Sequence, residues 1–303
     1  MNDNPVSSYL SKEVLDYEPT KEEIKFYHKN NLKSLRYIFC GKELDDFEKQ
    51  KIRELKEFVN KLKLKEKEKD KEKDKGKDKE KEVETYQTIF KNTLFDDDNY
   101  VLRFLQGNEF VFERCYNDML RHLTWRKENL PIPLSDVQTF LDKGYCYIHG
   151  RDKQMHPIII INCKNIISAN TKDVLKVLYY WLEFCISKLL IEGKVEQWRV
   201  IIDLTSCSVL NIPIATLKDI SKNLSCNYRS RLCKMLVLSA PLVVTGIWHM
   251  LKSIIPVVTQ QKITITSSEK EKKLLDQVQA NQLEKKFGGT CENATDFTEP
   301  ILP

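Results

Sequence analysis

The sequence predicts an α/β fold in which a helical N-terminal lobe packs on a five-stranded mixed sheet with crossover helices. Three observations lead to this prediction. Up to about residue 133, apolar positions recur at helical spacing. Short β-branched runs follow, and longer helical segments separate most of them, which is the pattern of parallel strands joined by crossovers.

The composition limits the class of protein. Hydrophobic residues make up 41% of the 303 residues, and the mean hydropathy is -0.45. No apolar run approaches the roughly 18–20 residues that cross a bilayer, and the first residues carry no secretory signal, so we expect a cytoplasmic protein. A net charge of +5 gives no support for nucleic-acid binding.

Cysteine and histidine spacing argues against a metal centre. The nine cysteines form no CxxC pair and the five histidines are scattered, so we expect buried apolar thiols and no metal site. Nucleotide-binding and hydrolase motifs are also missing. Asp203 ends a predicted strand, where an aspartate more often caps the next turn than acts as a catalytic acid. We therefore expect a protein that is not an enzyme.

The first part of the chain reads as helices around a charged segment. Residues 1–44 are expected to form a helical extension, with a helix that starts at Pro19-Thr20. Residues 45–133 are expected to form a helical lobe that ends at Pro131 and Pro133. Residues 61–82 contain eleven lysines and eight acids and are expected to be a disordered, solvated insert or a fraying helix. A weak tether to acidic membranes is the alternative to a neutral insertion. The predicted stripes on the first two helices are Ile24, Tyr27, Leu32, Leu35 and Ile38, then Ile52, Leu55, Phe58, Val59 and Leu62.

Residues 134–290 are expected to hold the sheet, and residues 291–303 a tail. The turn 151–157 is too short for a crossover, so the first two strands should be antiparallel and the later ones parallel. The predicted strands are 146–149, 158–162, 200–204, 235–239 and 263–266, and the predicted crossover helices are 172–191, 213–226 and 242–255.

The last of these helices has a wide apolar face. Ile247, Met250, Leu251 and Ile254 share it, and Trp248 and Ile255 widen it. An ordinary helix facing the core has this pattern, and so does a movable lid that meets acyl chains or a membrane interface.

Several separated motifs resemble those of the CRAL-TRIO lipid-binding family, including its phosphatidylinositol/phosphatidylcholine transfer proteins. LRFLQGNEF (102–110) and the later WRK resemble the family's LRFLRARKF and WRK. NYRSRLCKMLVLSAP (227–241) resembles YPERLGK followed by NAP, and the segment 248–265 resembles K-P-x-x-x-x-x-T-x-x-K-I. Phe287-Gly288-Gly289 is similar to the family's closing FGG.

The resemblance implies a monomer that encloses one lipid, its only ligand, in an apolar cavity between the sheet and the helices. Residues 242–255 would be its gate, with Leu242, Ile247, Trp248, Met250, Leu251, Ile254 and Ile255 on the apolar side. The expected cavity lining is Tyr179, Trp181, Phe184, Ile202, Leu204 and Leu238.

The phosphatidylinositol-transferring branch also implies headgroup residues. Its acid and its gate lysine fall on Asp219 and Lys252. Arg103 matches the arginine of LRF and would be either a structural ion-pair partner or a ligand contact. Two departures stand out: Asn108-Glu109 replaces an Arg-Lys pair whose lysine contacts phosphate, and Met155-His156-Pro157 replaces Gly-Arg-Pro.

Three functions remain open at this point. The first is transfer of phosphatidylinositol or another glycerophospholipid, with transient association with membrane phospholipids. The second is transport of a compact hydrophobic molecule such as a tocopherol, retinoid or sterol. The third is a lipid-sensing adaptor whose residues 1–44 bind a protein partner.

Overall fold

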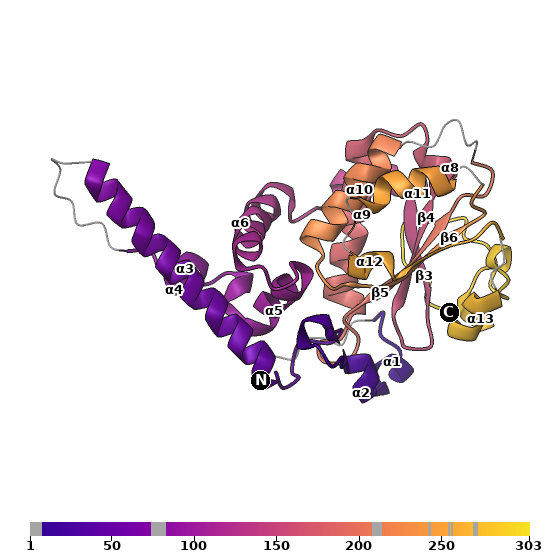
Figure 1. The fold of residues 1–303 in the computed structure, drawn as a ribbon. Coiled ribbons are helices and arrows are strands. Elements are labelled where there is room, and N and C mark those ends of the chain that lie inside the picture. Colours follow the sequence, from indigo (N-terminus) through magenta and orange to yellow (C-terminus); the bar gives the residue numbers. More distant parts are fainter. Residues whose placement is uncertain are drawn as a thin grey trace.

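The computed structural model describes residues 8–73, 83–207, 214–241, 244–253, 255, 257–268 and 272–303. A sheet packed between two layers of helices and loops forms the larger lobe, and a helical lobe lies beside it (Figure 1). Within these residues, none of the helices combines the length and the apolar character that a bilayer-spanning segment requires.

Among its described residues, the N-terminal part contains six α-helices and a two-stranded ribbon. Their bounds are α1 (Lys12–Asp16), α2 (Lys21–Ile24), β1 (Lys25–Phe26), β2 (Leu35–Arg36), α3 (Asp46–Lys73), α4 (Tyr86–Phe90), α5 (Asp98–Gly107) and α6 (Phe112–Asn129).

The second part alternates strands with helices. Its elements are α7 (Gln138–Leu141), β3 (Cys146–Arg151), β4 (Pro157–Asn162), α8 (Cys163–Ile166), α9 (Thr171–Phe184), β5 (Trp198–Asp203), α10 (Ile214–Asn227), β6 (Leu232–Leu238), α11 (Val244–Lys252), α12 (Val257–Gln260), β7 (Ile263–Ile265) and α13 (Lys272–Gln277).

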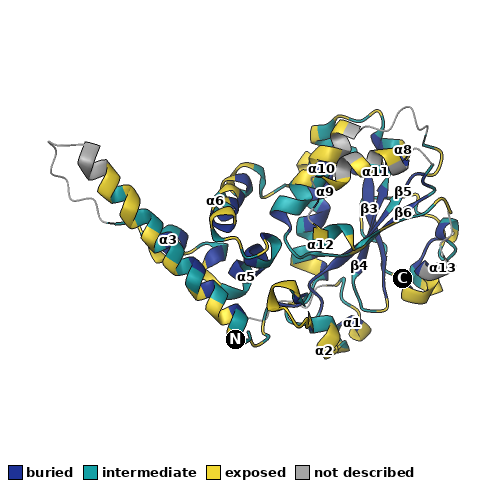
Figure 2. Ribbon diagram, viewed as in Figure 1, coloured by how far each residue is buried: buried dark blue, intermediate teal, exposed yellow. Residues whose placement is uncertain are grey.

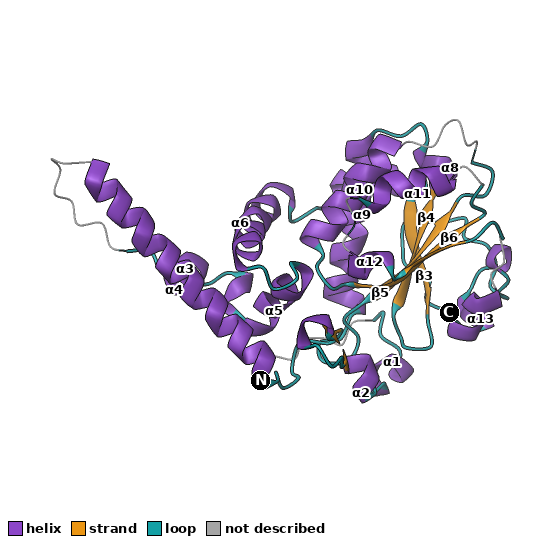
Figure 3. Ribbon diagram, viewed as in Figure 1, coloured by secondary structure: helices purple, strands orange, loops and turns teal. Residues whose placement is uncertain are grey.

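The sheet has the predicted topology. Its order is β3-β4-β5-β6-β7, in which β3 and β4 are antiparallel and the remaining neighbours are parallel. Right-handed crossovers that always advance in one direction place their helices on one face. Accordingly, α9 to α12 cover that face, and α13 with the C-terminal segment covers the other (Figure 3).

Alternation along the strands divides the core between these two faces. Ile159, Val200 and Trp198 pack toward α9, whereas Ile160, Ile201 and Leu238 pack toward α13. The strands β3, β4 and β5 are accordingly buried almost throughout (Figure 2), whereas β7 at the edge of the sheet is half-buried or exposed. The helical lobe has a core of its own around Phe39, Ile52, Leu55, Val59, Phe90, Phe95, Phe104 and Met119.

The predicted helix from residue 20 onward is wrong beyond Ile24. The chain instead forms the ribbon β1-β2, in which Lys25 lies opposite Arg36. Both side chains bond to the Glu48 carboxylate of α3, Lys25 at 2.7 Å and Arg36 at 2.6 Å. This buried charge network requires an extended backbone, so it outweighs the weak helical periodicity of the segment.

Where it is described, the charged insert is helical, which is one of the two forms expected for it. Residues 61–73 continue α3, which projects from the helical lobe (Figure 1), and residues 74–82 lie outside the described part. Lysine and glutamate are good helix formers and can pair along a helix, as Lys63 and Glu66 do at 2.9 Å. Charge alone therefore did not prevent helix formation here.

Candidate functional site: an apolar cavity between the sheet and α10–α12

A cavity of about 200 Å³ lies against the helix-covered face of the sheet. One wall consists of side chains that alternate along four strands and share this face. They are Ile161, Trp198, Val200, Ile202, Leu204, Leu232, Met235, Val237, Ile263 and Ile265. Because nearly all of them are aliphatic, this wall favours a hydrocarbon ligand.

Three crossover helices and their loops form the opposite wall. α10 contributes Ile220 and Leu224, α11 contributes Val244 and Trp248, and Val258 comes from α12. Ile255 lies in the loop between α11 and α12 and is buried against the cavity. The sheet thus provides one wall of the cavity, and the helices α10 to α12 provide the opposite wall.

Polar side chains collect at the amino ends of β5 to β7. Gln106, Arg229, Ser230 and Lys262 reach the cavity there, beside Tyr37. Gln106 donates to Ser230 at 3.3 Å. Arg229 is neutralised by Asp118, with Nη2 2.7 Å from the carboxylate. The end of the cavity away from α11 is therefore its polar end.

Lys262 is the cation at this end for which no carboxylate partner is found among the described residues. Its Nζ donates to the Leu232 carbonyl oxygen at 2.7 Å and lies 5.8 Å from the centre of the Tyr37 ring. Burial lowers the pKa of this amine to about 8, because removal from water disfavours the charged form. An anionic group in the cavity would restore the usual protonation of Lys262.

A second, more open groove of about 560 Å³ adjoins the cavity. Trp248, Ile263 and Ile265 line both spaces. Lys252 lines only the groove, where it is exposed at the end of α11. The indole of Trp248 thus lies at the boundary between the cavity and the outer groove.

The structure does not bring the three predicted headgroup residues together. Asp219 is exposed on α10 and does not line the cavity, although its neighbour Ile220 does. Lys252 belongs to the outer groove. Arg103 is only 2% exposed and pairs with Glu196, and its guanidinium stacks 4.2 Å from the Phe39 ring centre. Of the two roles weighed for Arg103, its surroundings are those of a structural ion pair.

The predicted gate helix coincides with α11, as far as the structure describes it. Trp248 and Ile255 line the cavity. Ile247, Met250 and Leu251 lie in α11, with side chains outside the described part, and Leu242 and Ile254 lie outside the described residues.

Two of the six residues predicted as lining lie at this cavity. Ile202 and Leu204 line the cavity. Tyr179, Trp181 and Phe184 do not, because α9 packs on β3 to β5 and uses them to fill the core beside the cavity. Leu238 is on the other face of the sheet, since it follows Val237 by one residue and strand side chains alternate.

Asn108-Glu109, which replaces the Arg-Lys pair of the family motif, leaves room for an anionic ligand in the cavity. Asn108 is buried and donates to Asp118 at 3.1 Å. Glu109 lies at the cavity rim, but its carboxylate is 3.2 Å from the Arg114 guanidinium and more than half exposed. A neighbouring cation and solvent therefore reduce the repulsion that this carboxylate would exert.

Asp203 has the capping role that the sequence favoured. Its Oδ1 accepts a hydrogen bond from the Thr205 backbone N–H at 2.9 Å. The residues that reasoning from sequence missed are Gln106, Arg229, Ser230 and Lys262. A signal for Lys262 existed, because this lysine is the one in the T-x-x-K-I motif, whereas the other three reach the cavity only through tertiary packing.

Comparison with known proteins agrees with this architecture. Residues 141–289 match the model of the CRAL/TRIO domain. A CRAL-TRIO domain-containing protein of Schizosaccharomyces pombe is 23% identical over 68% of this chain and 48% of its own length. The SEC14 cytosolic factor of Eremothecium gossypii is 25% identical over 65% of this chain and 70% of its own.

Two further matches extend the comparison. The phosphatidylinositol/phosphatidylcholine transfer protein SFH4 of Arabidopsis thaliana is 25% identical over 65% of this chain. The match covers 36% of that protein, so this chain spans about half or less of several of its relatives. The crystal structure of Sfh5 superposes with a TM-score of 0.51 at 15% identity, over 75% of this chain and 83% of that one, and shares its fold.

Proposed function

We propose that this chain, whose residues 141–289 match the CRAL/TRIO domain, is a lipid carrier and not an enzyme. It holds one lipid in the cavity and exchanges it at membranes. The observation that supports this most is the aliphatic cavity between the sheet and α10–α12. Relatives named for phosphatidylinositol and phosphatidylcholine transfer support a glycerophospholipid as the cargo.

The energetics of such a carrier rest on the acyl chains. Burial contributes about 0.8 kcal/mol per CH₂, so two chains contribute on the order of 20 kcal/mol. A polar contact to the headgroup contributes roughly 1–3 kcal/mol. Chain burial would hold the lipid, and polar residues would select the headgroup.

Exchange requires the cavity to open, and α11 is the proposed gate. At about 200 Å³ the cavity is smaller than the roughly 300–1,000 Å³ of most ligand pockets. A shift of Trp248 would join it to the outer groove of about 560 Å³. In that arrangement Lys262 faces the polar end of the cavity and Lys252 faces the outer groove. The protein would work in the cytoplasm and contact membrane surfaces transiently.

The small cavity also supports a second candidate, a compact ligand such as a tocopherol, retinoid or sterol. A third candidate, the lipid-sensing adaptor, is supported by the N-terminal extension. Phe26, Tyr27 and Leu32 are 48%, 68% and 53% exposed there, and such apolar side chains could contact a protein partner.

Native mass spectrometry with lipid extraction tests the carrier function. Ile263 and Thr264 are neighbours on β7, but only Ile263 lines the cavity, whereas Thr264 is exposed. We expect the purified protein to carry one lipid, Ile263→Trp to lose it, and Thr264→Trp to retain it. A glycerophospholipid supports the first candidate and a sterol or similar molecule the second. Protein that neither contains lipid nor extracts it from vesicles would overturn the carrier function.

A further inference from the structure

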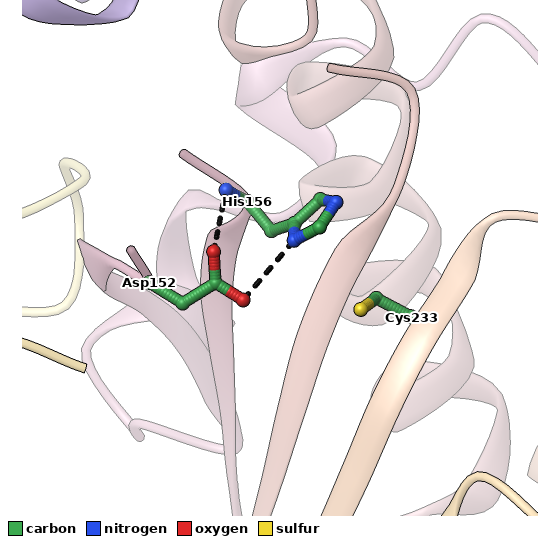
Figure 4. A group of neighbouring side chains, drawn as sticks. All are labelled: Asp152, His156 and Cys233. Carbon is green, nitrogen blue, oxygen red and sulfur yellow. Dashed lines mark hydrogen bonds and ion pairs between the residues drawn. The ribbon is translucent and has the colours of Figure 1, made fainter. Parts of the chain in front are cut away.

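Asp152, His156 and Cys233 converge at the amino ends of the strands, next to the polar end of the cavity. Asp152 and His156 come from the turn between β3 and β4, and Cys233 comes from β6 (Figure 4). One donor or acceptor atom from each residue lies within 4.8 Å of the others. The imidazole of His156 lies between the Asp152 carboxylate, to which it is bonded, and the Cys233 thiol (Figure 4).

Both halves of the His156–Cys233 pair depart from the family pattern. His156 stands where Gly-Arg-Pro has its arginine, and Cys233 stands where YPERLGK has its glycine. These two substitutions are 77 positions apart in the sequence (233 − 156), yet the fold brings them together. A thiol and an imidazole thus replace two residues that could not form such a pair.

A β-bulge places Cys233 at this point. Trp198 is paired with Leu232 and Arg199 with Lys234, so Cys233 is the extra residue between two regular pairs. Bulges redirect a side chain and are frequent beside functional sites. The preceding residue, Leu232, lines the cavity, and the thiol itself is half-buried.

The Asp152 carboxylate is saturated with donors, which argues against its binding a metal ion. Oδ1 accepts from the backbone N–H groups of Gln154 at 2.9 Å and His156 at 3.0 Å. Oδ2 contacts the guanidinium of Arg199 at 3.0 Å and His156 Nδ1 at 3.1 Å. With the cation of Arg199 in place, Asp152 orients His156 instead of offering a free ligand atom.

The charges around Cys233 favour its ionised form. His156, Arg199 and Lys262 are the cations that act on it, with Asp152 as the opposing charge. Tyr17 and Tyr37 approach from the N-terminal extension, and the Glu23 carboxylate acts on Tyr17. Asp152 raises the pKa of His156 to about 10 against the burial of the ring, and His156 lowers the pKa of Cys233 despite desolvation.

We propose that Asp152, His156 and Cys233 form a reactive-cysteine site, at which small hydroperoxides oxidise Cys233 to a sulfenic acid. The thiolate sulfur attacks one peroxide oxygen, an S–O bond forms and the O–O bond breaks. The departing oxygen leaves with the electron pair and takes a proton to give water or an alcohol. Sulfur loses two electrons and the peroxide gains them. The oxidised residue would adjoin Leu232, whose carbonyl holds Lys262 at the cavity.

Hydrogen peroxide and dimedone trapping, read peptide by peptide with mass spectrometry, test this site in the full chain. An ordinary thiol is only about 1% ionised at pH 6.5. We therefore expect Cys233 to be trapped at least about tenfold faster than the half-buried Cys40, Cys226 and Cys291 at this pH. His156→Gln should lower the Cys233 rate about tenfold at pH 6.5 and have little effect at pH 9.

A second measurement covers the case in which His156→Gln does not fold. The rate of Cys233 alkylation by iodoacetamide in the unsubstituted chain should have its pH midpoint below about 7.5. A midpoint at or above the usual 8.5, or trapping no faster than at the other cysteines, would overturn the proposal. So would a stoichiometric metal ion in the purified protein that shields Cys233 until it is chelated.

Discussion

Arg103 and Glu196 form a buried ion pair that joins the helical lobe to the sheet. The Glu196 carboxylate also accepts hydrogen bonds from the backbone N–H groups of Phe39 at 3.0 Å and Cys40 at 2.8 Å. One carboxylate thus fixes α5, the N-terminal extension and the loop before β5 together.

Removing the charge of Glu196 should therefore be costly. Breaking a buried pair leaves its partner uncompensated, at about 3–5 kcal/mol, and we expect Glu196→Gln to lower the free energy of unfolding by about 3 kcal/mol in urea denaturation. Glu109→Gln is the matched control, because it breaks an exposed pair with Arg114 worth at most about 1 kcal/mol. Equal losses in the two variants would contradict this view of Glu196.

Lys262 and Lys252 offer a direct comparison of the cavity with the groove. If the ligand carries a phosphate, Lys262→Met should reduce phosphatidylinositol transfer between vesicles about tenfold, since a hydrogen bond to a charged group contributes about 1.5–3 kcal/mol. Lys252→Met should change it less than about threefold, because water screens the exposed ammonium. The opposite order would assign the headgroup to the outer groove instead.

The ion pair of His156 with Asp152 should make the free energy of unfolding depend on pH. Its pKa is raised to about 10 by Asp152, so the stabilisation from the imidazolium is complete below its usual pKa of about 6.5 and is lost as the pH rises toward 10. We expect His156→Gln to cost on the order of 2 kcal/mol at pH 6 and much less at pH 10. Urea denaturation of both proteins at the two pH values measures this, and a cost independent of pH would refute it.

His122 has the opposite behaviour. Burial lowers its pKa to about 4, so only the unfolded chain gains a proton as the pH falls from 6.5 toward 4, and the folded state loses stability. We expect a loss of at most about 3 kcal/mol over this range, which His122→Gln should reduce. His249→Gln, at an exposed position of α11, is the control for the substitution itself. Equal pH slopes for His122→Gln and the unsubstituted protein would contradict this role of His122.

Features of the cavity that depend on local sequence patterns could be predicted, whereas features that depend on contacts between distant residues could not. Alternation and crossover lengths are local properties, so they were enough to predict the order and direction of the strands. The same alternation could have assigned Leu238 to the far face, because Val237 and Leu238 are adjacent in β6. Sequence alternation does not determine where α9 packs on the sheet. For this reason Tyr179, Trp181 and Phe184 were predicted to line the cavity, although they lie in the core beside it.

The sequence by itself determined the α/β class, the five-stranded mixed sheet, the resemblance to the CRAL-TRIO family and the position of the helix over the cavity, because each depends on periodicity or on a contiguous motif. Only the tertiary structure decided which charges meet. It buried Arg103 against Glu196, left Asp219 in solvent, brought Lys262 to the cavity and placed Cys233 beside His156. Such contacts join residues far apart in the chain, and their energies depend on burial and distance, which a linear pattern does not contain.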